Sequence, residues 1–285
     1  MRLISGKKRL TIPAACLLVF ALVLCSCGAA QAEGPEQAEA HRQLEVVQQR
    51  VVSGQLLYPG ATDSEGIETI LTRICLEHNL APRGVTTDSA KKPLAGDGSA
   101  NVLSSIGAKM TIEGDLQGVK AIVDEINETD YIRVHKMTYN TGSKTASLGL
   151  VVYMSEELEL FYDADPQNLQ AKTDELLAIE AALAEGWRQI QSGTRLDSEM
   201  LELLDSKASD SNVSIESYSF DADKELITVV FACMNETDCT GFVGAINDYE
   251  PFKHILYTGY NADIGKFRFT ITILLNTPEE EAAAQ

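Results

Sequence analysis

The sequence predicts an α+β protein in which a hydrophobic N-terminal helix and a helical stalk precede two copies of one small module. The main observation is an internal repeat. Residues 103–154 and 224–275 both follow the order strand, short helix, strand, turn, strand, and a further helix precedes each copy. A second observation is the uncharged stretch 10–32. With 45% hydrophobic and 23% charged residues, the chain as a whole is typical of a globular protein, and 285 residues are enough for two small domains.

The charge of the chain argues against nucleic acid and against an anionic lipid surface as partners. The formal net charge is -19. The basic residues Arg2, Lys7, Lys8 and Arg9 all precede the uncharged stretch, and the first acidic residue is Glu33. The rest of the chain therefore lacks the basic footprint that such partners require, and its acidity is typical of a soluble exterior.

Three interpretations of the N-terminal segment, residues 1–32, are open. About 20 apolar residues span a bilayer, so the segment is long enough for a retained transmembrane helix. Leu24-Cys25-Ser26-Cys27 has the form of a lipobox, in which Cys27 takes the lipid. Ala30-Gln31-Ala32 also has the form of a cleavage site for an ordinary signal peptide. The basic cluster places the N-terminus in the cytoplasm and the remainder outside.

The stalk is expected over residues 33–60. Residues 38–56 have a helical pattern, and Leu44, Val47, Val51 and Val52 form one apolar stripe. This length is short for a coiled coil, so the pattern indicates a stalk or a membrane-proximal pairing helix.

The first module is expected over residues 61–155. Asp63 or Ser64 caps a helix that ends near Asn79, Pro82-Arg83-Gly84 is a turn, a short strand lies near Val85, and 88–101 is a polar loop. The later elements are a strand around 106–112, a helix over 116–127 capped by Asp115, a strand over 131–139, a turn at 140–143 and a strand over 145–154.

Alternation assigns the two faces of the strand over 131–139. Tyr131, Arg133, His135, Met137 and Tyr139 are expected on one face. Ile132, Val134 and Lys136 are expected on the other face.

The linker region covers residues 156–192, and a linker helix is expected over 167–191. This helix carries Trp187, which is expected in core or inter-module packing.

The second module covers residues 193–277, and residues 278–285 form an acidic tail. Thr237 or Asp238 is expected to cap the second helix of this module. Its elements are a helix over 195–207, strands over 213–220 and 225–233, a helix over 239–248, a strand over 252–260, a turn at 261–263 and a strand over 266–275.

Each module therefore has the order helix, strand, strand, helix, strand, strand. Four strands with two helices on one face make a ferredoxin-like (αββαββ) module. The second face of the sheet is expected to be open to a partner or covered by the linker helix.

The residues that usually carry catalysis or bind metals do not form recognisable motifs. His41, His78, His135 and His254 have no metal-ligand spacing, and no Walker loop, GxSxG or strand-associated GxGxxG is present. We therefore expect no enzyme activity, no metal and no cofactor. Cys233 and Cys239 lie close enough in sequence to form a disulfide in an exported module, or they are two buried thiols.

The layout resembles a known family. A basic N-terminus, one hydrophobic span, a short helix and αββαββ units are similar to the PilO/PilN inner-membrane proteins of type IV pilus machines and to the GspM/GspL components of type II secretion. The segments that carry the resemblance are TIEGDLQGVKAIVDEINETDYIRVHKMTYN at 111–140 and TGFVGAINDYEPFKHILYTGY at 240–260. The second module in one chain and the lipobox-like LCSCG depart from the family plan.

The resemblance implies a non-enzymatic component that aligns a cytoplasmic motor with an outer assembly through pairwise contacts. The expected partners are other pilus or secretion inner-membrane proteins, or a second copy of the chain. The expected location is the bacterial cell membrane, with the C-terminal part extracytoplasmic. The alternative function is a surface lipoprotein, anchored at Cys27, that binds a small ligand or peptide.

Overall fold

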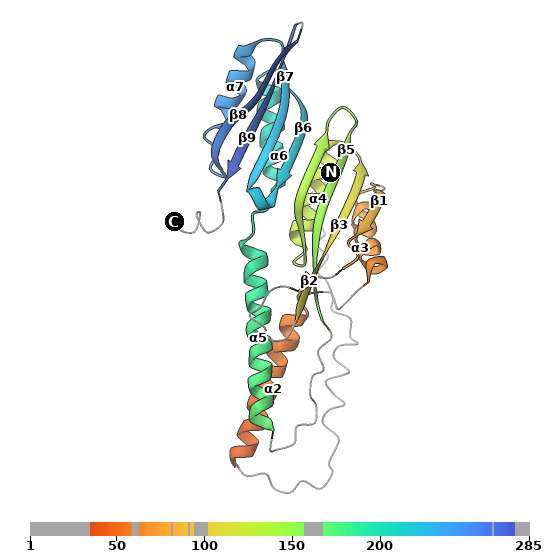
Figure 1. Ribbon diagram of the computed structural model, residues 1–285, viewed down its shortest axis with the longest axis vertical. Helices are drawn as coiled ribbons and strands as arrows, with labels where there is room; N and C mark the ends of the chain where they lie inside the picture. Colours follow the sequence, from red (N-terminus) through yellow and green to blue (C-terminus); the bar gives the residue numbers. More distant parts are fainter. Residues whose placement is uncertain are drawn as a thin grey trace, which may run out of the picture.

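A computed structural model of the chain describes residues 35–58, 63–80, 82–90, 92–93, 102–156, 168–263 and 265–276. The expected anchor, its candidate lipid-bearing Cys27 and the acidic tail lie outside the described residues. Within them the protein is a mixture of helices and one large antiparallel sheet, which confirms the α+β class (Figure 1).

The elements follow the predicted order in both halves of the chain. The first half contains α2 (Pro35–Gln55), α3 (Ser64–Glu77), β1 (Pro82–Thr87), β2 (Lys92–Pro93), β3 (Leu103–Glu113), α4 (Leu116–Glu128), β4 (Ile132–Asn140) and β5 (Thr145–Ser155). The second half contains α5 (Leu169–Ser192), α6 (Ser198–Asp210), β6 (Ser214–Asp221), a 3-10 turn at Ala222–Lys224, β7 (Leu226–Cys233), α7 (Glu236–Ile246), β8 (Phe252–Asp263) and β9 (Lys266–Leu275).

All the described strands belong to a single sheet. Its order is β1-β3-β5-β4-β6-β7-β9-β8, and β2 pairs with β3 beside β1. Every pairing is antiparallel. Each half contributes its four long strands in the same order, first-second-fourth-third, so the repeat in the sequence is also a repeat in the topology.

The helices form a continuous row against the sheet. α3 contacts α4, α4 contacts α6, and α6 contacts α7. The buried side chains beneath this row belong to one apolar cluster that includes residues from both halves, among them Ile67, Ile122, Tyr218, Phe231 and Phe242. Burial of this shared apolar surface is the main stabilising contribution to the described fold.

A β-bulge in β4 overturns the predicted assignment of its faces. The register between β4 and β5 shifts between Val134 and Lys136, so His135 is the extra residue. Ile132, Val134, Met137 and Tyr139 are consequently all buried. A bulge reverses the alternation beyond it, and sequence alternation alone does not reveal that reversal.

Two predicted turns are wrong. Pro82, Arg83 and Gly84 open strand β1, and the chain reverses earlier, at Asn79, whose φ of 57° is left-handed. Asn261, Ala262 and Asp263 continue strand β8, and the left-handed residue of that hairpin is Gly265, with φ of 75°. The turns were predicted from a Pro-Arg-Gly and an Asn-Ala-Asp segment, whose residue types favour turns, but the left-handed residues lie three and two positions away from them.

Two smaller expectations also change. The segment 88–101 is not a loop throughout, because Lys92 and Pro93 pair with Ser105 and Ser104 of β3. The N-cap of α7 is Asn235 rather than Thr237 or Asp238, and its side chain accepts a hydrogen bond from the Asp238 backbone N–H at 3.0 Å. An N-cap side chain satisfies an N–H that the first turn of the helix leaves unpaired.

Replacing Val134 by aspartate tests the bulge. Val134→Asp buries an unpaired carboxylate beneath the helices, and we expect it to lower the free energy of unfolding by about 3 kcal/mol. Thr138→Asp in the same strand is the control, because Thr138 is exposed, and we expect it to cost less than about 1 kcal/mol. Urea unfolding of both variants gives the comparison. Equal losses would contradict the assignment of the faces.

Candidate interaction surfaces

The junction between the two halves is a pairing of strand edges. β4 and β6 run antiparallel, with Lys136 opposite Asp221 and Asn140 opposite Ser217. Lys136 Nζ lies 3.4 Å from Asp221 Oδ2, and His135 Nε2 lies 3.1 Å from Asp223 Oδ2. The third strand of the first half thus meets the first strand of the second half.

Helix contacts strengthen the same junction. Lys120 of α4 is buried, and its Nζ lies 2.7 Å from Glu202 Oε2 of α6. Asn127 donates a hydrogen bond to the Leu196 carbonyl at 2.8 Å. The rings of Tyr139 and Tyr218 stack at 6.4 Å, and burial raises the pKa of Tyr218. The Tyr218 hydroxyl is buried without a hydrogen-bond partner in the described part of the chain.

The stalk consists of two helices, α2 and α5, that lie side by side below the sheet (Figure 1). Arg50 pairs with Glu180 at 3.2 Å, and the rings of Tyr58 and Trp187 meet edge-on at 6.3 Å. Gly54 lies between these pairs and approaches Leu183 so closely that a Cβ there would be 3.3 Å from Cδ1. Residue numbers rise together on both helices, so α2 and α5 are parallel.

Helix α5 of the same chain covers Leu44, Val47 and Val51 of the predicted apolar stripe of α2, whereas Val52, expected on the same stripe, is 36% exposed. Val47 and Val51 are buried in a cluster with Leu176, Ile179 and Leu183. Trp187 packs against this cluster, consistent with a packing role for the tryptophan. The linker helix therefore lies along the stalk helix rather than across the open face of the sheet.

A buried arginine lies where the stalk meets the sheet. Arg133 of β4 donates from Nη1 to the carbonyls of Thr129 and Ile132, at 2.8 and 2.7 Å. Its Nε and Nη2 are buried without a described partner, and burial lowers its pKa. Burial also raises the pKa of Tyr58 to about 12.

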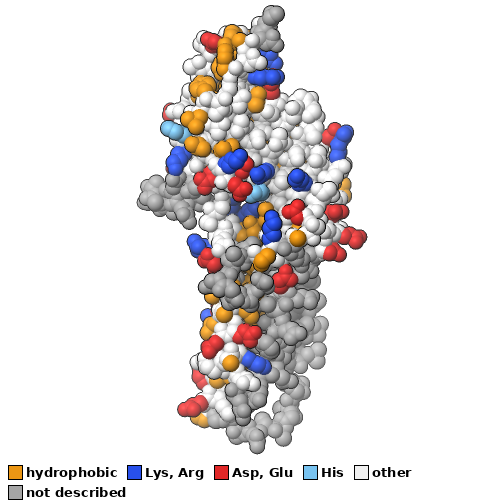
Figure 2. Space-filling model, viewed as in Figure 1, with side chains coloured by type: hydrophobic (Ala, Val, Ile, Leu, Met, Phe, Trp, Pro, Cys, Tyr) orange, Lys and Arg blue, Asp and Glu red, His pale blue; other side chains and the backbone are white. Residues whose placement is uncertain are grey.

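Among the described residues, edge strand β8 exposes two aromatic side chains, near the end of the molecule away from the stalk (Figure 1). Tyr257 and Tyr260 are both 56% exposed, and Leu256 is exposed beside them. Tyr260 packs against Phe267 and Phe269 of β9. In Figure 2 hydrophobic side chains gather over this upper part of the molecule. β8 has no further strand beside it among the described residues.

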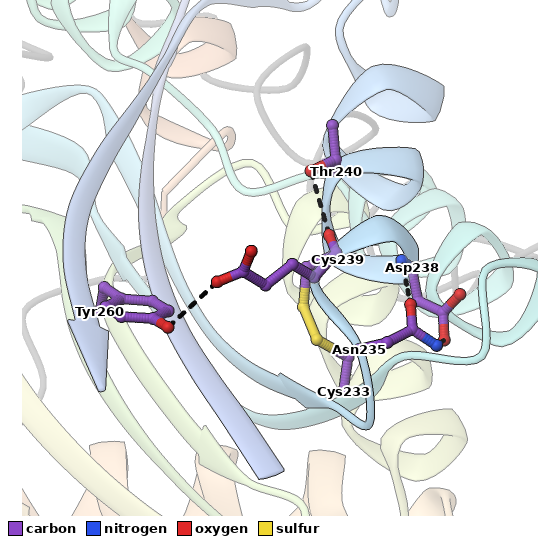
Figure 3. Close-up of a disulfide and its surroundings, with 7 residues drawn as sticks. Cys233, Asn235, Asp238, Cys239, Thr240 and Tyr260 are labelled. Atoms are coloured by element: carbon purple, nitrogen blue, oxygen red, sulfur yellow. Dashed lines mark hydrogen bonds between the residues drawn. A yellow bond between two sulfur atoms is a disulfide. The ribbon is translucent and has the colours of Figure 1, made fainter. Parts of the chain in front are cut away.

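A disulfide lies next to this edge. Cys233 ends β7 and Cys239 lies in α7, and the two are bonded across a sequence separation of 6 (Figure 3). Glu236 of the first turn of α7 accepts a hydrogen bond from the Tyr260 hydroxyl at 3.1 Å. The bond, the Asn235 cap and this contact fix the start of α7 against the rim of the sheet.

The histidines are not brought together. His41 lies in α2, His78 ends α3 beside Glu125 at 3.8 Å, and His254 lies on β8. In the part of the chain that the structure describes, no group of three or more His, Cys, Asp or Glu side chains could hold a metal ion. Cys75 is a free and buried cysteine, and burial raises its pKa to about 11.

None of the described helices is both long and apolar enough to cross a membrane. No protein-family model matches the chain, and no curated protein matches it.

Adjacent valines on α2 test the stalk. Val51 is fully buried against α5, whereas Val52 is 36% exposed. We expect Val51→Asp to destabilise the helix pair by about 2 kcal/mol, which lowers hydrogen-exchange protection in α2 and α5 roughly thirtyfold. Val52→Asp is the matched control, and it should change the hydrogen-exchange protection of these helices by less than about twofold. Equal effects would mean that α5 does not cover this stripe.

Removing the disulfide tests its contribution to the second half. We expect the double variant Cys233→Ala, Cys239→Ala to lose about 2 kcal/mol of unfolding free energy, because a short closed loop no longer restricts the unfolded chain. Reducing agent should lower the melting temperature of the parent and leave the double variant unchanged. A reductant effect on the double variant would show that the loss has another origin.

Proposed function

We propose that this protein is a non-enzymatic, membrane-anchored scaffold component of a type IV pilus or type II secretion-like machine, and that it acts through protein–protein contacts. The observation that carries the proposal is the side-by-side arrangement of two like halves. Strand β4 joins strand β6, and helix α2 joins helix α5. This pairing of like halves within one chain supports the proposal, because the same kind of contact can join modules of different chains.

The finer architecture is part of the proposal. We infer that residues 61–155 and 193–277 are two ferredoxin-like modules, each preceded by a stalk helix. The shared strand order and the antiparallel pairing support this, because four strands in the order first-second-fourth-third with two helices on one face are expected of the αββαββ arrangement.

The direction of the stalk supports attachment to a membrane through residues 1–32. The parallel helices α2 and α5 extend away from the sheet (Figure 1). An anchor that precedes Pro35 would hold both modules away from the bilayer. This arrangement suits a protein that bridges a membrane and an assembly outside it.

The test of this function is in-cell crosslinking of the full-length chain, followed by detergent extraction and mass spectrometry. We expect other envelope assembly proteins to accompany the chain, and we expect its N-terminus to begin at Met1 or Arg2. The same experiment with Cys27→Ala is the control, because a retained helix does not need this thiol.

The opposite result would favour the alternative function. Recovery of the chain alone, beginning at a lipidated Cys27, would contradict the scaffold function and support a ligand-binding surface lipoprotein. Release of the Cys27→Ala variant from the membrane would give the same conclusion about the anchor.

A further inference from the structure

Strand β8 occupies in the second half the position that β4 occupies in the first. Val134 pairs with Leu150 in β5, and Tyr257 pairs with Ile271 in β9, which corresponds to Leu150 in the repeat. Both strands then contain a bulge at the same place, after Val134 and after Tyr257. Beyond the bulge, Met137 and Tyr260 are equivalent, because they pair with the corresponding residues Leu148 and Phe269.

The two strands differ in what covers them. Val134 is 4% and Met137 is 1% exposed, because β6 pairs with the outer edge of β4 and α6 packs beside α4. The equivalent residues Tyr257 and Tyr260 are each 56% exposed. An aromatic surface of this kind on an unpaired strand edge is a template for another strand.

The opposite edge of the sheet is closed to the same kind of contact. β1 and β2 together take the place of β6. Ser105 and Leu226 are corresponding residues of the repeat; Lys92 of β2 pairs with Ser105, and Asp221 of β6 pairs with Leu226. The strand is interrupted between Thr87 and Lys92, and it begins at Pro82 and ends at Pro93. Proline lacks the N–H that a ladder needs, so this edge does not offer a continuous strand.

We propose that β8 accepts, in antiparallel pairing, the first strand of a like module carried by a different protein chain. The expected strand resembles β6, in which Tyr218 and Phe220 face the helices and Ser217 and Ser219 face the open side. A second copy of this chain is disfavoured as the partner, because in the same orientation it presents the interrupted β1–β2 edge.

The geometry of the internal junction also sets the direction of the partner. The third strand of the first half pairs antiparallel with the first strand of the second half. This pairing leaves the two halves in the same orientation, and the helices α2 and α5 that precede them are likewise parallel. A partner that docks on β8 by the same pairing therefore keeps its stalk parallel to this one. The inference rests on the proposed scaffold function and specifies its contact surface.

The test uses the chain's own β6 sequence as the probe. A biotinylated peptide of residues 213–222, VSIESYSFDA, is mixed with the full-length chain in detergent, with a photoreactive benzoylphenylalanine in place of Tyr260. The control carries the same photoreactive residue in place of Leu76, which is exposed on α3. Ultraviolet irradiation then attaches peptide that lies within reach of the probe.

We expect labelling at position 260 to exceed labelling at position 76, and labelling by a scrambled peptide, by about fivefold or more. Adding Tyr257→Asp to the chain should reduce labelling at position 260 by a similar factor, because this change alters β8 and leaves β4 intact. The proposal would be overturned if the β6 peptide and the scrambled peptide labelled position 260 equally. Equal labelling at positions 260 and 76, or equal labelling with and without Tyr257→Asp, would also overturn it.

A second measurement addresses self-pairing. Sedimentation of the full-length chain in detergent should give the same mass for the parent and for Tyr260→Asp. A dimer that this substitution dissociates would mean that a second copy fills the edge, and the proposal would fall. Because purified chain and peptide are used, a failure here leaves the crosslinking test of the scaffold function unaffected.

Discussion

The antiparallel pairing of β4 with β6 is the contact on which the rest of the described structure depends. It turns two sets of four strands into one sheet and brings α4 against α6. Side chains from both halves then share one apolar cluster, including Met137 and Tyr218. Without this pairing each half would expose a strand edge and an apolar helix flank, which folded proteins rarely leave open.

The same pairing explains the stalk. Because the third strand of one half meets the first strand of the other, the two halves point in the same direction, and the helices that precede them are parallel. α5 can therefore cover Leu44, Val47 and Val51 of α2. The two edges of the sheet differ. Among the described residues β8 has no strand beside it and exposes Tyr257 and Tyr260, whereas the β1–β2 edge is interrupted between Thr87 and Lys92 and has proline at both ends.

The sequence predicted the class and order of the elements because hydrophobic periodicity reports local burial well. It did not predict the bulge at His135, because an extra residue in one strand is determined by the partner strand. The turns at Asn79 and Gly265 were misplaced because turn-favouring residues, proline and glycine at 82–84 and asparagine and aspartate at 261–263, stand close by within strands. Neither the β4–β6 contact nor the exposure of Tyr260 could be predicted, because both depend on which edge of one half meets which edge of the other.

The most direct measurement of the central claim is a designed disulfide across the junction. Thr138 and Ser219 are cross-strand partners, so the double variant Thr138→Cys, Ser219→Cys should form an intramolecular bond in the folded full-length chain without denaturation. The control is the double variant Thr138→Cys, Ser217→Cys, whose two positions are not cross-strand partners. It should form little intramolecular disulfide. Efficient bonding of the first pair alone would support one continuous sheet through β4 and β6. Equal or absent bonding in both variants would contradict it.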